Sequence, residues 1–138
     1  MYQKVTLIGN LGGDPEQRFA PSGTAITSFR MATNEVYNDK EGKRVKRTTW
    51  WRITAWGKLG EICNQYLKKG SKVLVEGTLV PDDKGNPRIW KTQEGEPRAS
   101  FELRAQTVKF LDPRGSTGEP GEATPEEPVT EDHEDMPF

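Results

Sequence analysis

The sequence predicts an all-β domain, either a small closed barrel or an open sandwich, followed by a tail without a core. Apolar and polar residues alternate with a period of two over most of the first 110 residues, which is typical of half-buried strands. Only one segment has the spacing of an amphipathic helix, and beyond residue 111 apolar residues are too sparse to fold. Alternation does not show whether a sheet closes on itself, so this pattern does not decide between the barrel and the sandwich.

Five strands and the breaks between them follow in order along the chain. The strands are expected at residues 4–8, 24–33, 47–56, 71–80 and 99–110. Glycine, proline and aspartate mark the breaks. These fall at residues 9–15, 21–23, 38–43 and 81–87, with a short hairpin around 88–97.

One short helix is predicted between the third and fourth strands. Its apolar stripe has the spacing i, i+3, i+4, i+7 and i+8 and consists of Leu59, Ile62, Cys63, Tyr66 and Leu67. Gly60 within it is mildly unfavourable, so the helix must depend on packing. Cys63 lies on the stripe and is expected to be a small core residue rather than a reactive thiol.

Charge is divided unequally along the chain. Residues 111–138 hold nine of the 21 acidic but only one of the 20 basic side chains, a net charge of −8, which leaves +7 on residues 1–110. This asymmetry predicts a body that binds a polyanion and an acidic appendage. The alternative is that the charge serves solubility alone.

Composition argues against several classes of protein. No stretch approaches the roughly 20 apolar residues of a membrane helix. The strand pattern begins too close to Met1 for a signal peptide, and the single cysteine suits a reducing compartment, so a cytoplasmic location is expected. The only histidine, His133, lies in the tail, which leaves no Ser-His-Asp or Cys-His arrangement and no zinc ligand set. We therefore expect no enzyme, no metal and no cofactor.

The segment at residues 49–56 is the most informative for binding. With a period of two, Trp50, Arg52 and Trp56 share one face, and Trp51 falls on the other, which faces a core or an interface. Two indoles around a guanidinium are poor core composition, but they suit bases that stack on flat side chains. The alternative is that the two tryptophans cap an apolar edge while the arginine snorkels.

Further basic and aromatic residues surround this strand in the sequence. They are Tyr37, Lys40, Lys43, Arg44, Lys46 and Arg47 before it and Arg88, Trp90 and Lys91 in the later hairpin. Such interleaving is what a groove for single-stranded nucleic acid needs, because phosphates supply affinity and bases supply π-faces.

Several ordered motifs resemble those of bacterial single-stranded DNA-binding proteins. They are VTLIGNLGGDPE at residues 5–16, WWRITAWGK at 50–58, YLKKG at 66–70 and VEG at 75–77. The resemblance implies an OB-fold over residues 1–111, a five-stranded Greek-key barrel with one short helix between strands 3 and 4. It also implies a disordered acidic tail over residues 112–138, a homotetramer, and sequence-nonspecific binding of single-stranded DNA in replication, recombination and repair at the nucleoid.

The resemblance also implies roles for individual residues. The stacking positions match Trp50, Trp56, Trp90 and, less closely, Tyr37. The phosphate-contact positions match Arg18, Arg52, Lys58, Lys68 and Lys69, to which the basic loops add Lys43, Lys46, Arg88 and Lys91. Trp51 stands where a smaller polar ring is common, and it contributes either to an oligomer contact or to core filling.

The last residues resemble the segment with which this family docks replication and repair enzymes. They are Asp132, Glu134, Asp135, Met136, Pro137 and Phe138. Two other hypotheses share the basic, aromatic surface: an RNA-binding OB module, and a protein-interaction module that docks acidic partners.

Overall fold

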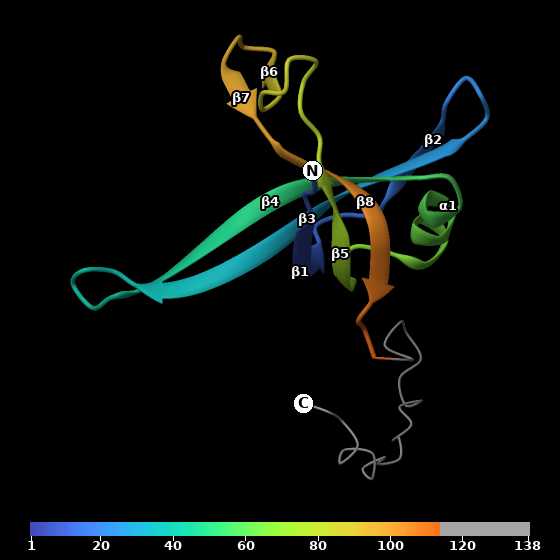
Figure 1. Cartoon of the computed structure of the whole chain (residues 1–138). Helices are drawn as coiled ribbons and strands as arrows, with labels where there is room; N and C mark the ends of the chain where they lie inside the picture. Colours follow the sequence, from blue (N-terminus) through green and yellow to red (C-terminus); the bar gives the residue numbers. More distant parts are fainter. Residues whose placement is uncertain (114–138) are drawn as a thin grey trace.

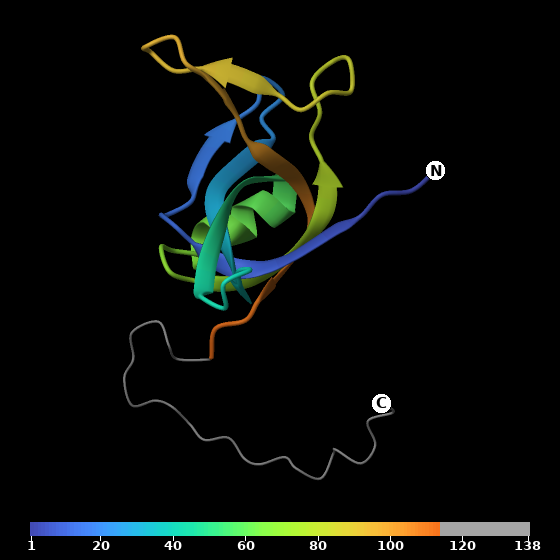
Figure 2. The same ribbon diagram turned by 90° about the vertical axis from the view of Figure 1, so that its left-hand side faces the viewer.

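The computed structural model describes residues 1–113. The expected docking residues 132–138, and almost all of the expected tail, lie outside this range. Within it, a β-barrel carries a helix at one end, a long hairpin that extends from the other end, and a short hairpin above (Figure 1). Figure 2 looks along the barrel, with the helix behind the ring of strands.

The five predicted strands and the helix between the third and fourth of them are confirmed. The barrel strands are β1 (Val5–Leu11), β3 (Ala25–Asn38), β4 (Arg44–Trp56), β5 (Lys72–Leu79) and β8 (Phe101–Phe110), and the helix is α1 (Gly57–Tyr66). The predicted short hairpin is β6 (Ile89–Lys91) and β7 (Pro97–Ala99). One strand, β2 (Glu16–Phe19), pairs with β3 and was not predicted, because four residues are too few to show a period.

The ring closes through a short contact between its first two strands. The order is β1-β5-β8-β4-β3, and β3 returns to β1 through the pairs Asn10↔Ala32 and Leu11↔Met31. Gly9 permits this approach, because a Cβ there would lie 2.1 Å from the Ala32 carbonyl oxygen. The contact between β4 and β8 is parallel. Closure decides between the barrel and the open sandwich, and this strand order is that of an OB-fold.

The core fills the barrel and continues beneath α1. Its fully buried side chains come from four strands and the helix. They are Met31, Ile53, Ala55, Cys63, Val73, Val75 and Leu103. Burial raises the pKa of the Cys63 thiol to about 11, because the charged thiolate is poorly solvated there. The prediction that this cysteine belongs to the core is confirmed.

The helix approaches the barrel closely at Gly60. A Cβ at this position would lie 2.5 Å from the carbonyl oxygen of Ala55, and the Thr27 hydroxyl donates a hydrogen bond of 2.7 Å to the Gly60 carbonyl. The glycine that is unfavourable for an isolated helix therefore permits the contact that holds this helix in place.

Three turns around the barrel share one construction. They span residues 39–43, 82–86 and 92–96, and each has a glycine at its fourth position with a φ between 82° and 87°. In each turn the glycine N–H donates to the carbonyl of the first residue, whose own N–H donates to the carbonyl of the fifth. The side chains of Asp39, Asp82 and Thr92 accept the N–H groups of the third and fifth residues. These loops therefore hold their shape through their own hydrogen bonds.

Candidate nucleic-acid interface

The outer face of β4 carries the predicted binding side chains in one row. Trp50, Arg52 and Trp56 are exposed on it, and the two tryptophans are 44% and 39% exposed. Ile53 and Ala55, on the opposite face, are fully buried. The alternation predicted for this strand is therefore confirmed.

Trp90 approaches this row from the hairpin of β6 and β7. Its indole Nε1 donates a hydrogen bond of 3.0 Å to the hydroxyl oxygen of Ser100, and half of its surface is exposed. Ser100 lies between β7 and β8, next to the point where β8 begins to pair with β4. The hydrogen bond thus ties the hairpin to the barrel beside the row.

Two adjoining hollows lie between β4 and this hairpin, and together we call them the tryptophan groove. Their volumes are about 590 and 620 Å³, and both are lined by Arg52, Trp90 and Ser100. Trp50 lines the first hollow and Trp56 lines the second. The groove therefore brings together three of the predicted stacking residues and one predicted phosphate contact.

Two further predicted phosphate contacts, Arg18 and Arg88, line the second hollow. The Arg88 guanidinium lies 3.7 Å from the carboxylate of Glu102, which also lines this hollow. Arg88 is exposed, whereas only 17% of the Glu102 side chain is exposed. The pair therefore holds the Arg88 guanidinium at this hollow, and Glu102 places a negative charge there as well.

The remaining predicted phosphate contacts lie outside the tryptophan groove. All of them are exposed lysines: Lys43 in the turn at 39–43, Lys46 on β4, Lys58 on α1, Lys68 and Lys69 after α1, and Lys91 on β6. Lysines so placed can extend a positive path for a phosphate backbone beyond the groove. Their contact with nucleic acid stays a prediction.

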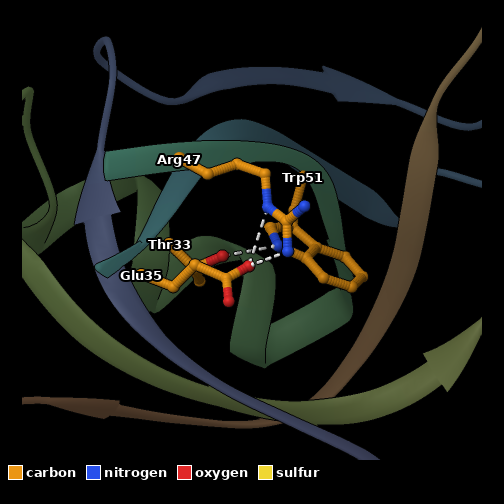
Figure 3. A network of polar contacts seen from close by, with 4 residues as sticks. All are labelled: Thr33, Glu35, Arg47 and Trp51. Atoms are coloured by element: carbon orange, nitrogen blue, oxygen red, sulfur yellow. Dashed lines mark hydrogen bonds and ion pairs between the residues drawn. The ribbon is translucent and has the colours of Figure 1, made fainter. Parts of the chain in front are cut away.

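Tyr37 lies on the other face of the long hairpin from Trp50. The register pairs Glu35 with Arg47 on the face that also carries Trp51, and alternation places Tyr37 on that same face. The Arg47 guanidinium lies 2.6 Å from the Glu35 carboxylate (Figure 3). It also lies 5.4 Å from the centre of the tyrosine ring. The hydrogen bond and the charge of Glu35 raise the pKa of Arg47. The structure thus separates Tyr37 from the three tryptophans, and its stacking role stays a prediction.

Trp51 is half-buried and packs against the core. Its indole Nε1 donates a hydrogen bond of 3.1 Å to the Thr33 hydroxyl (Figure 3), and its ring centre lies 5.1 Å from that of Phe101. These contacts fit core filling, and its remaining exposed surface borders the first hollow. A contribution to an oligomer contact stays a prediction.

The sequence pattern does not single out Arg30 and Arg104, yet both lie beside the indoles. The Arg30 guanidinium is 4.5 Å from the ring centre of Trp50, and that of Arg104 is 5.0 Å from the ring centre of Trp56. Alternation can show that an arginine is exposed. It cannot show which strands lie beside β4. Arg104 reaches Trp56 only because β8 pairs in parallel with β4, which places Arg104 beside Thr54.

Comparison with known proteins gives a family over the whole barrel. Residues 2–111 match the Single-strand binding protein family. The chain is 44% identical over 108 residues to a single-stranded DNA-binding protein of Neisseria meningitidis, covering 78% of this chain and 59% of that one. It is 40% identical over 122 residues to single-stranded DNA-binding protein 1 of Chlorobaculum tepidum, covering 88% and 72%. The structure of a Plasmodium falciparum SSB in complex with ssDNA superposes with a TM-score of 0.67 at 28% identity, covering 81% of this chain and 97% of that one.

The matched region covers most of this chain but only part of some relatives. The matched region spans less than two thirds of the Neisseria protein, at 59% of its length. Within residues 1–113, no helix is long and apolar enough to cross a membrane. The matched family consists of binding proteins, which agrees with the prediction that this chain is not an enzyme. The chain belongs to the single-strand binding protein family.

Proposed function

We propose that this protein binds single-stranded DNA without sequence preference in the tryptophan groove. The observation that carries the proposal is the placement of Trp50, Trp56 and Trp90 with Arg52 around one open channel. Indoles accept any base because every base has a π-face, and guanidinium groups meet the phosphate backbone. Family membership and the names of the relatives support DNA as the ligand.

We also propose that two parts of the chain have different functions. Residues 1–111 bind and protect single-stranded DNA during replication, recombination and repair, in the cytoplasm at the nucleoid. Residues 112–138 carry a tip that recruits replication and repair enzymes. The sequence of the tip supports this, because Phe138 suits an apolar pocket while Asp135 suits a basic rim.

A homotetramer would present several grooves to one strand of DNA, since each chain has one OB-fold. An open strand edge supports this assembly. In the described part of the chain, β1 pairs with β3 only at Asn10 and Leu11, and Ile8 on β1 is 52% exposed. Unpaired edges favour pairing with another chain. Native mass spectrometry of the full chain should give the mass of a tetramer with and without oligo-dT, and a persistent monomer would contradict it.

Tryptophan fluorescence tests the proposed ligand directly. The full chain, titrated with oligo-dT at low salt, should show strong quenching, and the affinity should fall as salt rises because phosphates release counterions. Competition between poly-dT and poly-rU separates DNA from RNA, and preference for poly-rU would make the protein an RNA-binding module. Unchanged fluorescence together with no mobility shift would refute nucleic-acid binding and favour a protein-interaction module.

A further inference from the structure

Two arginines flank the tryptophan row from opposite sides. Arg30 comes from β3 and Arg104 from β8, the strands that pair with the two edges of β4. Each guanidinium lies against one indole, Arg30 at 4.5 Å from the ring centre of Trp50 and Arg104 at 5.0 Å from that of Trp56. At these distances a cation is attracted by the face of the ring.

The strand registers explain why both arginines share the face of the row. Arg30 stands directly opposite Arg52 in the antiparallel pair of β3 and β4, and Arg104 stands beside Thr54 in the parallel pair of β4 and β8. Paired residues of neighbouring strands project to the same side of a sheet. Three guanidinium groups and two indoles therefore form one surface across three strands, with Arg52 at its centre.

Carboxylates lie near this surface, Glu102 beside Arg52 and Asp14 and Glu16 on the side of Arg30, but none of them lies within ion-pair distance of Arg30 or Arg104. In the described residues the ion pairs within 4 Å are Lys4–Glu76, Arg47–Glu35, Arg88–Glu102 and Arg98–Glu96. Neither Arg30 nor Arg104 takes part in one, and both are exposed. Arg30 stands directly opposite Arg52, and like charges so placed repel each other. An anion bound between the strands would relieve that repulsion.

The two arginines also lie where a nucleic-acid backbone would pass. Arg30 lines the first hollow of the tryptophan groove, and Arg104 lines the second. A guanidinium against an indole keeps its N–H donors available for a phosphate, while the exposed part of the ring remains open to a base. Trp50 and Trp56 are six residues apart on β4, about 20 Å along the strand. Nucleotides of one strand can therefore occupy both positions.

We propose that Arg30 and Arg104 contact single-stranded DNA directly, each forming with its neighbouring tryptophan a seat for one nucleotide. The base stacks on the indole, and the guanidinium binds the adjoining phosphate. This inference rests on the proposed function of the groove. It adds two phosphate contacts, placed by the pairing of the strands, to those predicted along the sequence.

Substitution with a matched control tests the two seats. Arg30→Ala and Arg104→Ala in the full chain are compared with Lys109→Ala, which removes the same charge from an exposed position of β8 outside both hollows. The affinity for oligo-dT is measured at several salt concentrations for each variant and for the unchanged chain. Arg30→Lys and Arg104→Lys keep the charge but lose the planar fork.

Each alanine variant should weaken binding roughly five- to tenfold at 0.1 M salt and reduce the salt slope by about 0.7, the value for one phosphate contact on a single strand. Each lysine variant should keep the slope and lose part of the affinity. Lys109→Ala should bind like the unchanged chain.

Two results would overturn the inference while leaving the proposed function intact. One is binding by the alanine variants that equals binding by Lys109→Ala. The other is weaker binding with an unchanged salt slope, which would show that the arginines only position the indoles. If the unchanged chain itself fails to bind oligo-dT, the proposed function fails first. Circular dichroism of each variant confirms that the barrel is folded.

Discussion

The indole of Trp90 and the hydroxyl of Ser100 are joined by a hydrogen bond of 3.0 Å. The tryptophan lies on a three-residue strand whose only partner in the described chain is β7. Ser100 immediately precedes β8, a strand of the barrel. Both residues line both hollows of the tryptophan groove. The bond therefore orients the one indole of the groove that the barrel does not itself carry.

Ser100→Ala should weaken oligo-dT binding by about 1 kcal/mol, because it removes one hydrogen bond and lets the Trp90 ring turn. Ser100→Thr keeps the hydroxyl and should restore much of the affinity. Ser22→Ala, in an exposed turn, serves as the matched control and should bind normally. Fluorescence titration measures all three, and normal binding by Ser100→Ala would show that the hairpin holds its tryptophan without this bond.

Trp56→Ala should weaken oligo-dT binding by roughly 1–3 kcal/mol while leaving the barrel folded, because one stacking surface is lost. Tyr66→Ala removes an exposed aromatic residue of α1, outside the groove, and should have no such effect. Equal affinities for Trp56→Ala and the unchanged chain would remove this residue from the binding surface.

Gly60→Ala should lower the free energy of unfolding by about 1–3 kcal/mol, because the added methyl group overpacks the contact between α1 and Ala55. Alanine is the better helix former. An increase in stability would therefore mean that α1 can shift away from Ala55 without cost, which would contradict the proposed tight contact. Gly13→Ala is the control, since no atom lies within 4 Å of the position of its Cβ. Urea unfolding of the three proteins gives the comparison.

Cys63 should make stability fall as pH rises from about 9 towards 11. Its pKa is about 11 in the folded protein and 9.0 for an unperturbed thiol, so between these values the folded state retains a proton that the unfolded state releases. The stabilisation is complete below pH 9 and is lost on the alkaline side. The difference in unfolding free energy between the unchanged chain and Cys63→Ala should therefore shrink from pH 8 to pH 10.5. A constant difference would contradict the shift.

Deleting residues 136–138 should abolish recruitment of replication and repair enzymes and leave the affinity for oligo-dT equal or higher, because an acidic tail competes for a basic groove. Co-sedimentation of such enzymes with DNA-bound protein measures recruitment, and fluorescence measures affinity. A chain with Ser116→Ala in the tail serves as the control. Undiminished recruitment after the deletion would place the docking residues elsewhere.

The barrel strands, the helix and the row on β4 could be predicted because each depends on a periodicity within one segment. Closure could not, since it depends on the pairs Asn10↔Ala32 and Leu11↔Met31 between distant segments. The same limit applies to the site. Trp50 and Trp56 follow from alternation, whereas Arg30 and Arg104 become neighbours of these indoles only through pairing between strands. The sequence also could not show that Arg47 pairs with Glu35 while it lines the first hollow.

The long hairpin differs from the ring in its hydrogen-bonding partners. β8 pairs with β4 only from Trp51 to Thr54, so the part of β4 at residues 44–50 has β3 as its single neighbour. Amide protons in this arm can exchange with solvent through local opening, whereas those at the centre of the ring exchange only when the whole barrel unfolds. The arm that carries Lys43 and Lys46 is therefore compliant beside a rigid binding surface. It can adjust to the path of a passing strand, and Trp50, at the end of this stretch, would move with it.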